Sequence, residues 1–243
     1  MNSSQGTAPR TEKKSSMFQT SLDMTDSCKE LIYSMKKLYY TGEYSDLVIS
    51  CGGKYYKVHK AIVCPRSKFF AKACSGDFKE GRDGTIELPE DDPQIVNIMI
   101  YYLYHLDYDA SSLMRKANDT EDELTRNIPA PQPCYPTLVV HAKVYALAEK
   151  YFLDSLKALS TQKFEKIALN YNPRSRVPEG LVESMQEVYT STVDTDRGLR
   201  DVVIKAFHKH KALLGSAEVR EVLKEIPLLT YELLMYVYQN GNW

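Results

Sequence analysis

The sequence predicts an α+β fold, a small β-sheet flanked by helices, followed by a helical C-terminal extension. Runs rich in β-branched and aromatic residues occur on both sides of Gly52-Gly53 and again in "GTIEL" (84–88). Apolar residues at helical spacing surround these runs. From residue 137 onward only helical spacing is found. A small sheet followed by helices alone is the order of an α+β domain with a helical extension.

Bulk composition limits the classes of partner. The chain has 243 residues, of which 43% are apolar, enough for one large domain or one domain with a smaller helical piece. Lys and Arg total 31 against 32 Asp and Glu, for a net charge of -1. Nucleic-acid binding surfaces need a surplus of positive charge, so we expect no direct nucleic-acid partner. No apolar run approaches the ~20 residues that cross a bilayer, so we expect no membrane partner.

The first 25 residues are expected to form a disordered tail. They are rich in Ser, Thr and charge, and they contain no apolar segment typical of a secretory signal. We therefore expect the cytoplasm, the nucleus or both, where the five cysteines would be thiols.

The next segments alternate between helix and strand. "DSCKELIYSMKKLYY" (26–40) predicts a helix, with Asp26 as N-cap and Leu31, Met35 and Leu38 on one face. "DLVISCGGKYYKVHK" (46–60) predicts a β-hairpin, because two glycines can take the positive φ angles of a tight turn. "AIVCPRSKFFAKAC" (61–74) predicts two helical turns broken near Pro65, the second capped by Ser67.

A strand at "GTIEL" leads into an apolar helix with Asp92 as N-cap and Pro93 at its first position. Residues 110–136, acidic and then proline-rich, are expected to form a mobile insertion. Helices follow at 137–152 and at 154–169, the latter with Asp154 as N-cap. The remainder is expected to be helical, with Gly215 and Pro227 as breaks and Thr230 capping the last helix.

The order of these features resembles the BTB/POZ domain. Asp46 precedes the first strand, "VHK" ends the second, "SKFFAKAC" follows as a small helix, and "IELPEDDP" leads into the helix ending in "YLYHLDY". "HAKVYALAEKYFLDSLKALSTQKF" resembles the helical pair that completes the domain, and this wording and "CPRSKFF" are similar to the fungal branch. The resemblance covers residues 26–170. Residues 171–243 resemble only weakly the helical, BACK-like continuation of such proteins.

The resemblance implies a protein–protein interaction module. Many BTB domains bind a cullin-3 type scaffold as substrate adaptors of a ubiquitin ligase, through a hydrophobic–x–Glu pattern in the loop before the third strand. That pattern falls on Phe78-Lys79-Glu80, with adjoining contacts from helices in 137–170. Alternatively, Phe78 folds back into the core. A client would bind the C-terminal helices or the 110–136 insertion.

Other residues take roles by the same resemblance. Leu31, Met35 and Leu38 occupy the place of the dimerisation helix, which either mediates self-association or simply covers the domain. His59 corresponds to a buried histidine at a strand end. Asp46 is expected to accept backbone N–H bonds where the helix hands over to the sheet.

Sequence patterns for catalysis, cofactors or metals are lacking. Cys51, Cys64 and Cys74 are 13 and 10 residues apart, without the close pair typical of zinc sites. His208 and His210 point in different directions on a helix. No phosphate-binding loop, zinc-protease or hydrolase motif occurs. We therefore expect no enzyme, no cofactor, no metal and no catalytic residue; a cysteine-based enzyme is the third hypothesis, after the adaptor and an oligomerising scaffold linked to transcriptional regulators.

Overall fold

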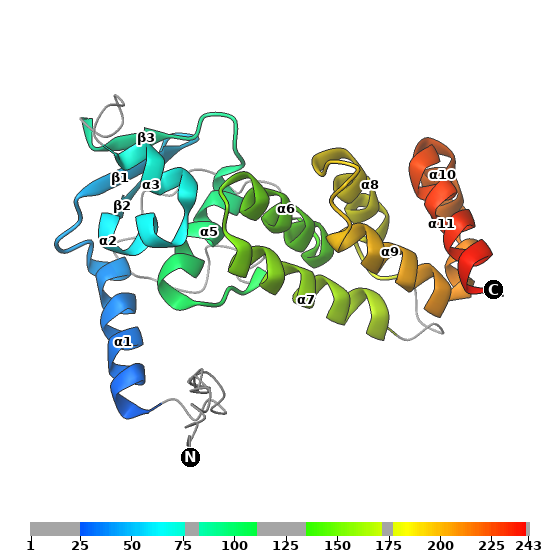
Figure 1. The fold of residues 1–243 in the computed structure, drawn as a ribbon, viewed down its shortest axis with the longest axis horizontal. Coiled ribbons are helices and arrows are strands. Elements are labelled where there is room, and N and C mark those ends of the chain that lie inside the picture. Colours follow the sequence, from blue (N-terminus) through cyan, green and yellow to red (C-terminus); the bar gives the residue numbers. More distant parts are fainter. Residues whose placement is uncertain (1–24, 76–82, 111–134, 172–176, 242–243) are drawn as a thin grey trace, which may run out of the picture.

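The structure, a computed structural model, describes residues 25–75, 83–110, 135–171 and 177–241 (Figure 1). The predicted N-terminal tail before residue 25 and residues 111–134 of the predicted insertion lie outside these ranges. Within the described ranges, no helix is both long and apolar enough to span a membrane.

A three-stranded mixed sheet lies in the N-terminal half. It is built from β1 (Leu47–Cys51), β2 (Lys54–Val58) and β3 (Thr85–Glu87) in the order β2-β1-β3. β1 pairs antiparallel with β2, from Leu47 opposite Val58, and parallel with β3. Gly52 and Gly53 both have positive φ in the hairpin, and a Cβ at Gly52 would lie 2.3 Å from Pro93 Cγ. The predicted hairpin is confirmed, and its first glycine is required by space as well as by conformation.

Helices accompany this sheet. They are α1 (Asp26–Thr41), which packs on α5 and extends away from the sheet (Figure 1), α2 (Lys60–Val63), a 3₁₀ turn η1 (Cys64–Arg66), α3 (Lys68–Cys74) and α5 (Pro93–His105). The predicted caps of two of them are present: Ser67 Oγ accepts from Phe70 N–H at 3.2 Å and Asp92 Oδ1 from Gln94 N–H at 2.9 Å. α5 is buried along most of its length and forms the centre of the first hydrophobic core.

A helical pair, α6 (Thr137–Lys150) and α7 (Asp154–Asn170), lies between the sheet and the C-terminal helices (Figure 1). Val140, Val144 and Leu147 of α6 belong to the first core. Leu138 and Tyr145, on its other side, belong to a second core. One helix therefore serves two cores, which explains why nearly every position of α6 before Glu149 is at least half-buried.

The C-terminal part is helical, as predicted. It contains α8 (Leu181–Ser191), α9 (Gly198–Lys209), a 3₁₀ turn η4 (Lys211–Gly215), α10 (Ala217–Glu225) and α11 (Pro227–Asn240). The second core lies among these helices, α6 and α7, and is centred on side chains such as Met185, Val203 and Phe207, which are fully buried.

Three predicted N-caps are wrong. α1 is capped by Thr25, whose Oγ1 accepts from Cys28 N–H at 3.4 Å, and Asp26 is its first helical residue. α7 begins at Asp154, after Leu153. α11 begins at Pro227, and Thr230 in its first turn donates to Leu223 O instead. An acidic residue is favourable in the first helical turn as well as at the cap, so residue type alone does not separate the two positions.

Candidate functional site

Phe78, Lys79 and Glu80 lie outside the described residues. The description ends after Ser75, at the C-terminus of α3, and resumes at Asp83, just before β3. α3 and β3 are therefore the described elements next to the predicted contact residues in the sequence, and the surface that they form is described below.

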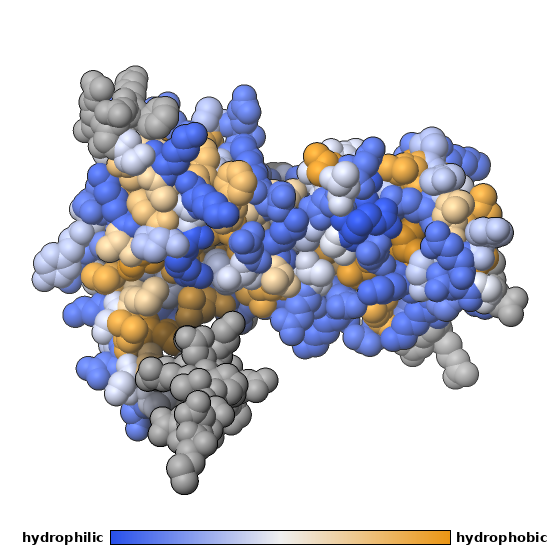
Figure 2. Space-filling view, in the orientation of Figure 1, coloured by the Kyte–Doolittle hydropathy of each residue, from blue (hydrophilic) through white to orange (hydrophobic). Residues whose placement is uncertain are grey.

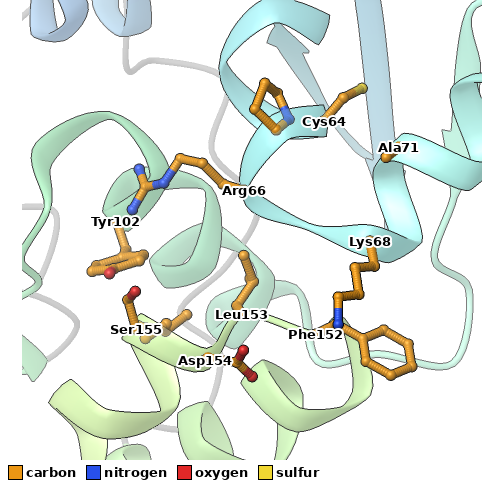
Figure 3. A pocket seen from close by; sticks show the side chains of 11 residues that line it. Cys64, Arg66, Lys68, Ala71, Tyr102, Phe152, Leu153, Asp154 and Ser155 are labelled. Atoms are coloured by element: carbon orange, nitrogen blue, oxygen red, sulfur yellow. The ribbon is translucent and has the colours of Figure 1, made fainter. Parts of the chain in front are cut away.

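An exposed surface with two hollows lies between α3, β3 and the turn that joins α6 to α7. The hollows have volumes of about 560 and 590 Å³ and share Lys68 and Phe152. The first lies between η1, α3 and the start of α7 and includes Arg66, Tyr102 and Asp154 (Figure 3). The second is lined by Lys68, Phe69, Lys72, Ala73, Ile86, Glu87 and Phe152. We call the two hollows together the Phe152 surface.

Phe152 sits in an unusual backbone conformation. Its φ is 55°, in the left-handed region, and 55% of the residue is exposed. Phe152 N–H donates to Glu149 O and Leu153 N–H to Ala148 O, which is the hydrogen-bond pattern of a Schellman helix end. Glycine usually occupies this position because a side chain there is strained. A strained bulky residue that exposes an aromatic ring is a reason to look for function.

Ser67 and Tyr151 hold the turn in place. Ser67 Oγ caps α3 and donates to Tyr151 O at 2.7 Å, which joins α3 to the end of α6. The Tyr151 ring stacks on Phe70 and its hydroxyl donates to Asp91. Phe152 thus projects from a backbone that is bonded on both sides, so its ring is presented in a defined direction.

Charges of both signs surround the apolar centre of this surface. Lys68 and Lys72 lie on the α3 side, and Glu87 and Asp154 lie opposite them. Figure 3 shows the Lys68 side chain extending toward Phe152. The Arg66 guanidinium lies 4.9 Å from the centre of the Tyr102 ring and donates to Leu103 O. An aromatic centre with a charged rim is the anatomy of a protein–protein contact.

Burial affects the thiols of Cys64, which lines the first hollow, and of Cys51 on β1. Burial, with a smaller contribution from the hydrogen bond to Cys74, raises the pKa of the Cys64 thiol to about 12. Burial also raises the pKa of Cys51. Both thiols are therefore protonated at neutral pH, whereas a nucleophilic cysteine needs a lowered pKa. In the part of the chain that the structure describes, no cluster of His, Cys, Asp and Glu could hold a metal ion.

His59 and Asp46 lie together at the junction of hairpin and helices. His59 is buried, with Nδ1 2.7 Å from Tyr104 Oη and Nε2 2.7 Å from Glu43 O. Asp46 Oδ1 accepts from Lys60 N–H at 2.8 Å, at the start of α2. Every polar atom of the His59 ring has a partner, so the residue has the contacts of a structural histidine.

The predicted self-association residues lie on α1, which extends away from the sheet (Figure 1). None of its residues is buried, and Leu31 is 64% exposed. Met35 is partly buried, and Leu38 packs against the first core near the end of the helix. The first half of α1 therefore presents apolar side chains to its surroundings.

Sequence reasoning missed Phe152 as a surface residue. "AEKYFLDS" places it directly after the buried Tyr151, with no glycine to mark the end of α6. One signal was available, because Phe152 does not fit the helical stripe of Val144, Leu147 and Tyr151. An aromatic residue that is out of phase just before a helix start can be expected at a surface turn.

A family model and two curated proteins match part of this chain. Residues 35–120 match the family model described as BTB/POZ domain. Kelch-like protein 11 of Homo sapiens is 24% identical over 91 residues, 34% of this chain and 13% of that protein. Kelch-like protein 11 of Mus musculus is 26% identical over 86 residues, 32% of this chain and 12% of that protein. The chain thus spans only a small part of the curated relatives that it matches.

Two solved structures are also similar to part of this chain. The BTB domain of zebrafish PATZ1 has a TM-score of 0.41 and 11% identity, covering 61% of this chain and 99% of that one. The BTB (Tramtrack and Bric a brac) domain of human Gigaxonin has a TM-score of 0.36 and 16% identity, covering 60% of this chain and 98% of that one.

Proposed function

From the BTB/POZ domain that this chain contains, a protein-interaction fold, we propose that the protein is a substrate adaptor that binds a cullin-3 type scaffold of a ubiquitin ligase. The Phe152 surface is the observation that carries the proposal. Its exposed aromatic ring, strained backbone and charged rim are the features expected of a protein-docking site.

The proposal joins Phe78-Lys79-Glu80 to this surface. The elements that flank these residues in sequence, α3 and β3, both line the hollow beside Phe152. Phe78 would then fill a pocket of the cullin next to Phe152, and Glu80 would accept N–H bonds from the scaffold. Burial of one Phe side chain contributes about 1.5–3 kcal/mol, so two such anchors are enough to dominate an interface of moderate affinity.

Binding of the full chain to the N-terminal region of a cullin-3 type protein tests the proposal by calorimetry. We expect micromolar or tighter binding by the wild type. Phe78→Asp and Phe152→Gly should each weaken it at least tenfold. Tyr55→Asp is the matched control, because Tyr55 is an exposed aromatic residue on β2, away from both hollows.

Circular dichroism and a melting curve for each variant separate a loss of contact from a loss of fold. No binding by the wild type would rule out the adaptor function. Binding that survives Phe152→Gly but not Phe78→Asp would remove the Phe152 surface from the interface. We also propose that the chain belongs to the fungal branch of the family and that a client protein binds the C-terminal helices or residues 110–136.

Self-association through α1 is the second candidate function. It is favoured by the exposure of Leu31, Tyr33 and Tyr40 on a helix with no buried residue. An oligomerising scaffold would sediment as a dimer that Leu31→Asp converts to a monomer, and it would show no cullin binding. A monomer at all concentrations would exclude this candidate.

A further inference from the structure

The last helix, α11, has an outer face that is almost free of charge. Over residues 227–241 the sequence is "PLLTYELLMYVYQNG", in which Glu232 is the only charged residue. Leu229 and Leu233 face inward and are buried in the second core. Tyr231, Leu234 and Tyr238 face outward, 59%, 66% and 82% exposed. Their spacing of three and four places them in one line on the helix.

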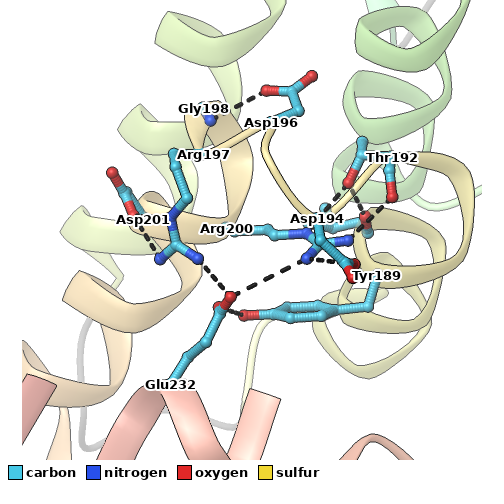
Figure 4. Close-up of polar contacts among 10 residues, drawn as sticks. Tyr189, Thr192, Asp194, Asp196, Arg197, Gly198, Arg200, Asp201 and Glu232 are labelled. Atoms are coloured by element: carbon cyan, nitrogen blue, oxygen red, sulfur yellow. Dashed lines mark hydrogen bonds and ion pairs between the residues drawn. The ribbon is translucent and has the colours of Figure 1, made fainter. Parts of the chain in front are cut away.

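Glu232, the one charged residue, anchors α11 to α8 and α9. It accepts from Tyr189 Oη at 2.6 Å and from Arg197, and it lies 3.9 Å from Arg200, which is 1% exposed (Figure 4). Arg200 also donates to Thr192 and Asp194 and lies over the Tyr189 ring. These contacts fix α11 against α8 and α9. The exposed side chains on its outer face are therefore already positioned, and less conformational entropy is lost when a partner binds.

A groove of about 490 Å³ runs beside this line, between α9 and α11. Ile204, Met235 and Tyr236 supply its apolar surface. Arg197 at one end is bonded to both Asp201 and Glu232, so these charges are already paired. Lys205 lines the groove two turns further along α9, and the ring of His208, one turn beyond Lys205, meets the Tyr236 ring edge-on. Within the described ranges, Lys205 forms no ion pair.

Apolar side chains also reach the surface over the C-terminal helices on the right of Figure 2. A line of exposed residues at helical spacing beside an apolar groove fits the face of a second helix. The unpaired positive charge of Lys205 fits a carboxylate on that helix. A second copy of this chain that docked through the same groove is a poorer match, because Asp201 and Glu232, the carboxylates that line the groove, are both occupied by Arg197.

We propose that the groove between α9 and α11, with Tyr231, Leu234 and Tyr238, binds an amphipathic helix of another protein. That helix carries apolar residues at spacings of three and four and an acidic residue opposite Lys205. The site shares no residue with the Phe152 surface or with α1, so this proposal can be tested independently of cullin binding.

A library of displayed single-helix peptides, randomised at the positions of one face, provides the probe, with the full chain as bait. We expect the selected peptides to carry apolar residues at helical spacing and a Glu or Asp at one end. By calorimetry, Leu234→Asp and Tyr238→Asp should weaken each selected peptide at least tenfold. Tyr55→Asp, an exposed aromatic on β2, should leave binding unchanged.

A charge swap tests the predicted orientation. Lys205→Glu should weaken binding about tenfold, and the same peptide with its acidic residue changed to Lys should recover affinity for this variant. Circular dichroism checks that each variant is folded. Peptides that bind Leu234→Asp as well as wild type, or that show no acidic preference, would overturn the proposal. So would a wild-type dimer that Leu234→Asp makes monomeric, because the occupant would then be a second copy. Unchanged cullin binding in these variants keeps the two sites distinguishable.

Discussion

At the scale of single residues, Phe152 combines a strained backbone with an exposed aromatic ring, and substitutions can test the two features separately. Its left-handed backbone costs an L-residue roughly 1–2 kcal/mol, and glycine avoids this cost. The sequence did not reveal it, because a phenylalanine at a helix end gives no signal for positive φ. Asp92 and Pro93, by contrast, are common at a helix start and were located correctly from sequence.

Phe152→Gly and Phe152→Ala form a matched pair that measures this strain. Both remove the ring, but only glycine relieves the backbone, so we expect Phe152→Gly to be about 1 kcal/mol more stable than Phe152→Ala. Urea unfolding at neutral pH measures the difference. Equal stability of the two variants would show that the turn adopts another conformation.

The buried His141 makes stability depend on pH. Its Nδ1 lies 2.8 Å from Tyr108 Oη, and burial lowers the pKa of His141 to about 4. Burial also lowers the pKa of His105. A lowered folded-state pKa means that the unfolded chain takes up the proton first, near pH 6.5. The neutral His141 therefore contributes its full stabilisation of the folded state above pH 6.5, and this contribution is lost as the pH falls toward 4.

Between pH 7 and pH 5 we expect the free energy of unfolding to fall by about 2 kcal/mol from His141 alone. His141→Gln keeps an acceptor for the Tyr108 hydroxyl but does not titrate, so its loss over this range should be smaller. Urea unfolding at the two pH values is the measurement. A wild type and a variant with the same pH dependence would contradict the assignment.

At the scale of elements, apolar spacing in the sequence predicted most of the helices correctly. It did not predict the polar contacts between them. Leu199, Val202 and Phe207 lie in the part of the chain that was predicted to be helical, and all three are buried on α9. Arg200, between them, is buried too, although a charged residue in sequence is expected at the surface. Its guanidinium donates to Thr192 and Asp194 and lies 3.9 Å from Glu232, the less exposed of its two carboxylate partners. Glu232 is 32 residues away in the sequence, and no local pattern indicates such a partner.

Glu232→Gln should destabilise the protein by about 3 kcal/mol, because Arg200 then keeps its buried charge without its buried counter-charge. Asp194→Asn is the matched control: Asp194 also pairs with Arg200, but its side chain is 81% exposed. A pair with an exposed carboxylate is worth at most about 1 kcal/mol. Thermal and urea unfolding compare the two variants, and similar losses would show that the Glu232 cluster does not anchor α11.

At the scale of the whole molecule, α6 and α7 bind the two cores together. Their second face, including Leu138 and Phe164, is buried against the C-terminal helices. Lys157 bonds to Asp196 in the loop before α9, and Tyr145 donates to the same carboxylate. The order of these helices could be predicted from the sequence. Their contact with two cores could not, because the helical spacing of apolar residues is the same whichever core they face.

A chain that ends at residue 170 tests the proposed division into a BTB/POZ domain (26–170) and an extension (171–243). This fragment keeps the first core but exposes Leu138, Tyr145 and Phe164, which are buried in the full chain. We expect it to bind the dye ANS, to aggregate and to melt below the full chain, because exposed apolar patches of this kind promote association. Polar substitutions at Leu138 and Phe164 should restore solubility to the fragment, although the same changes should destabilise the full chain. A soluble, monomeric fragment that melts at the temperature of the full chain would show that residues 26–170 fold independently and that the second core is an accessory unit.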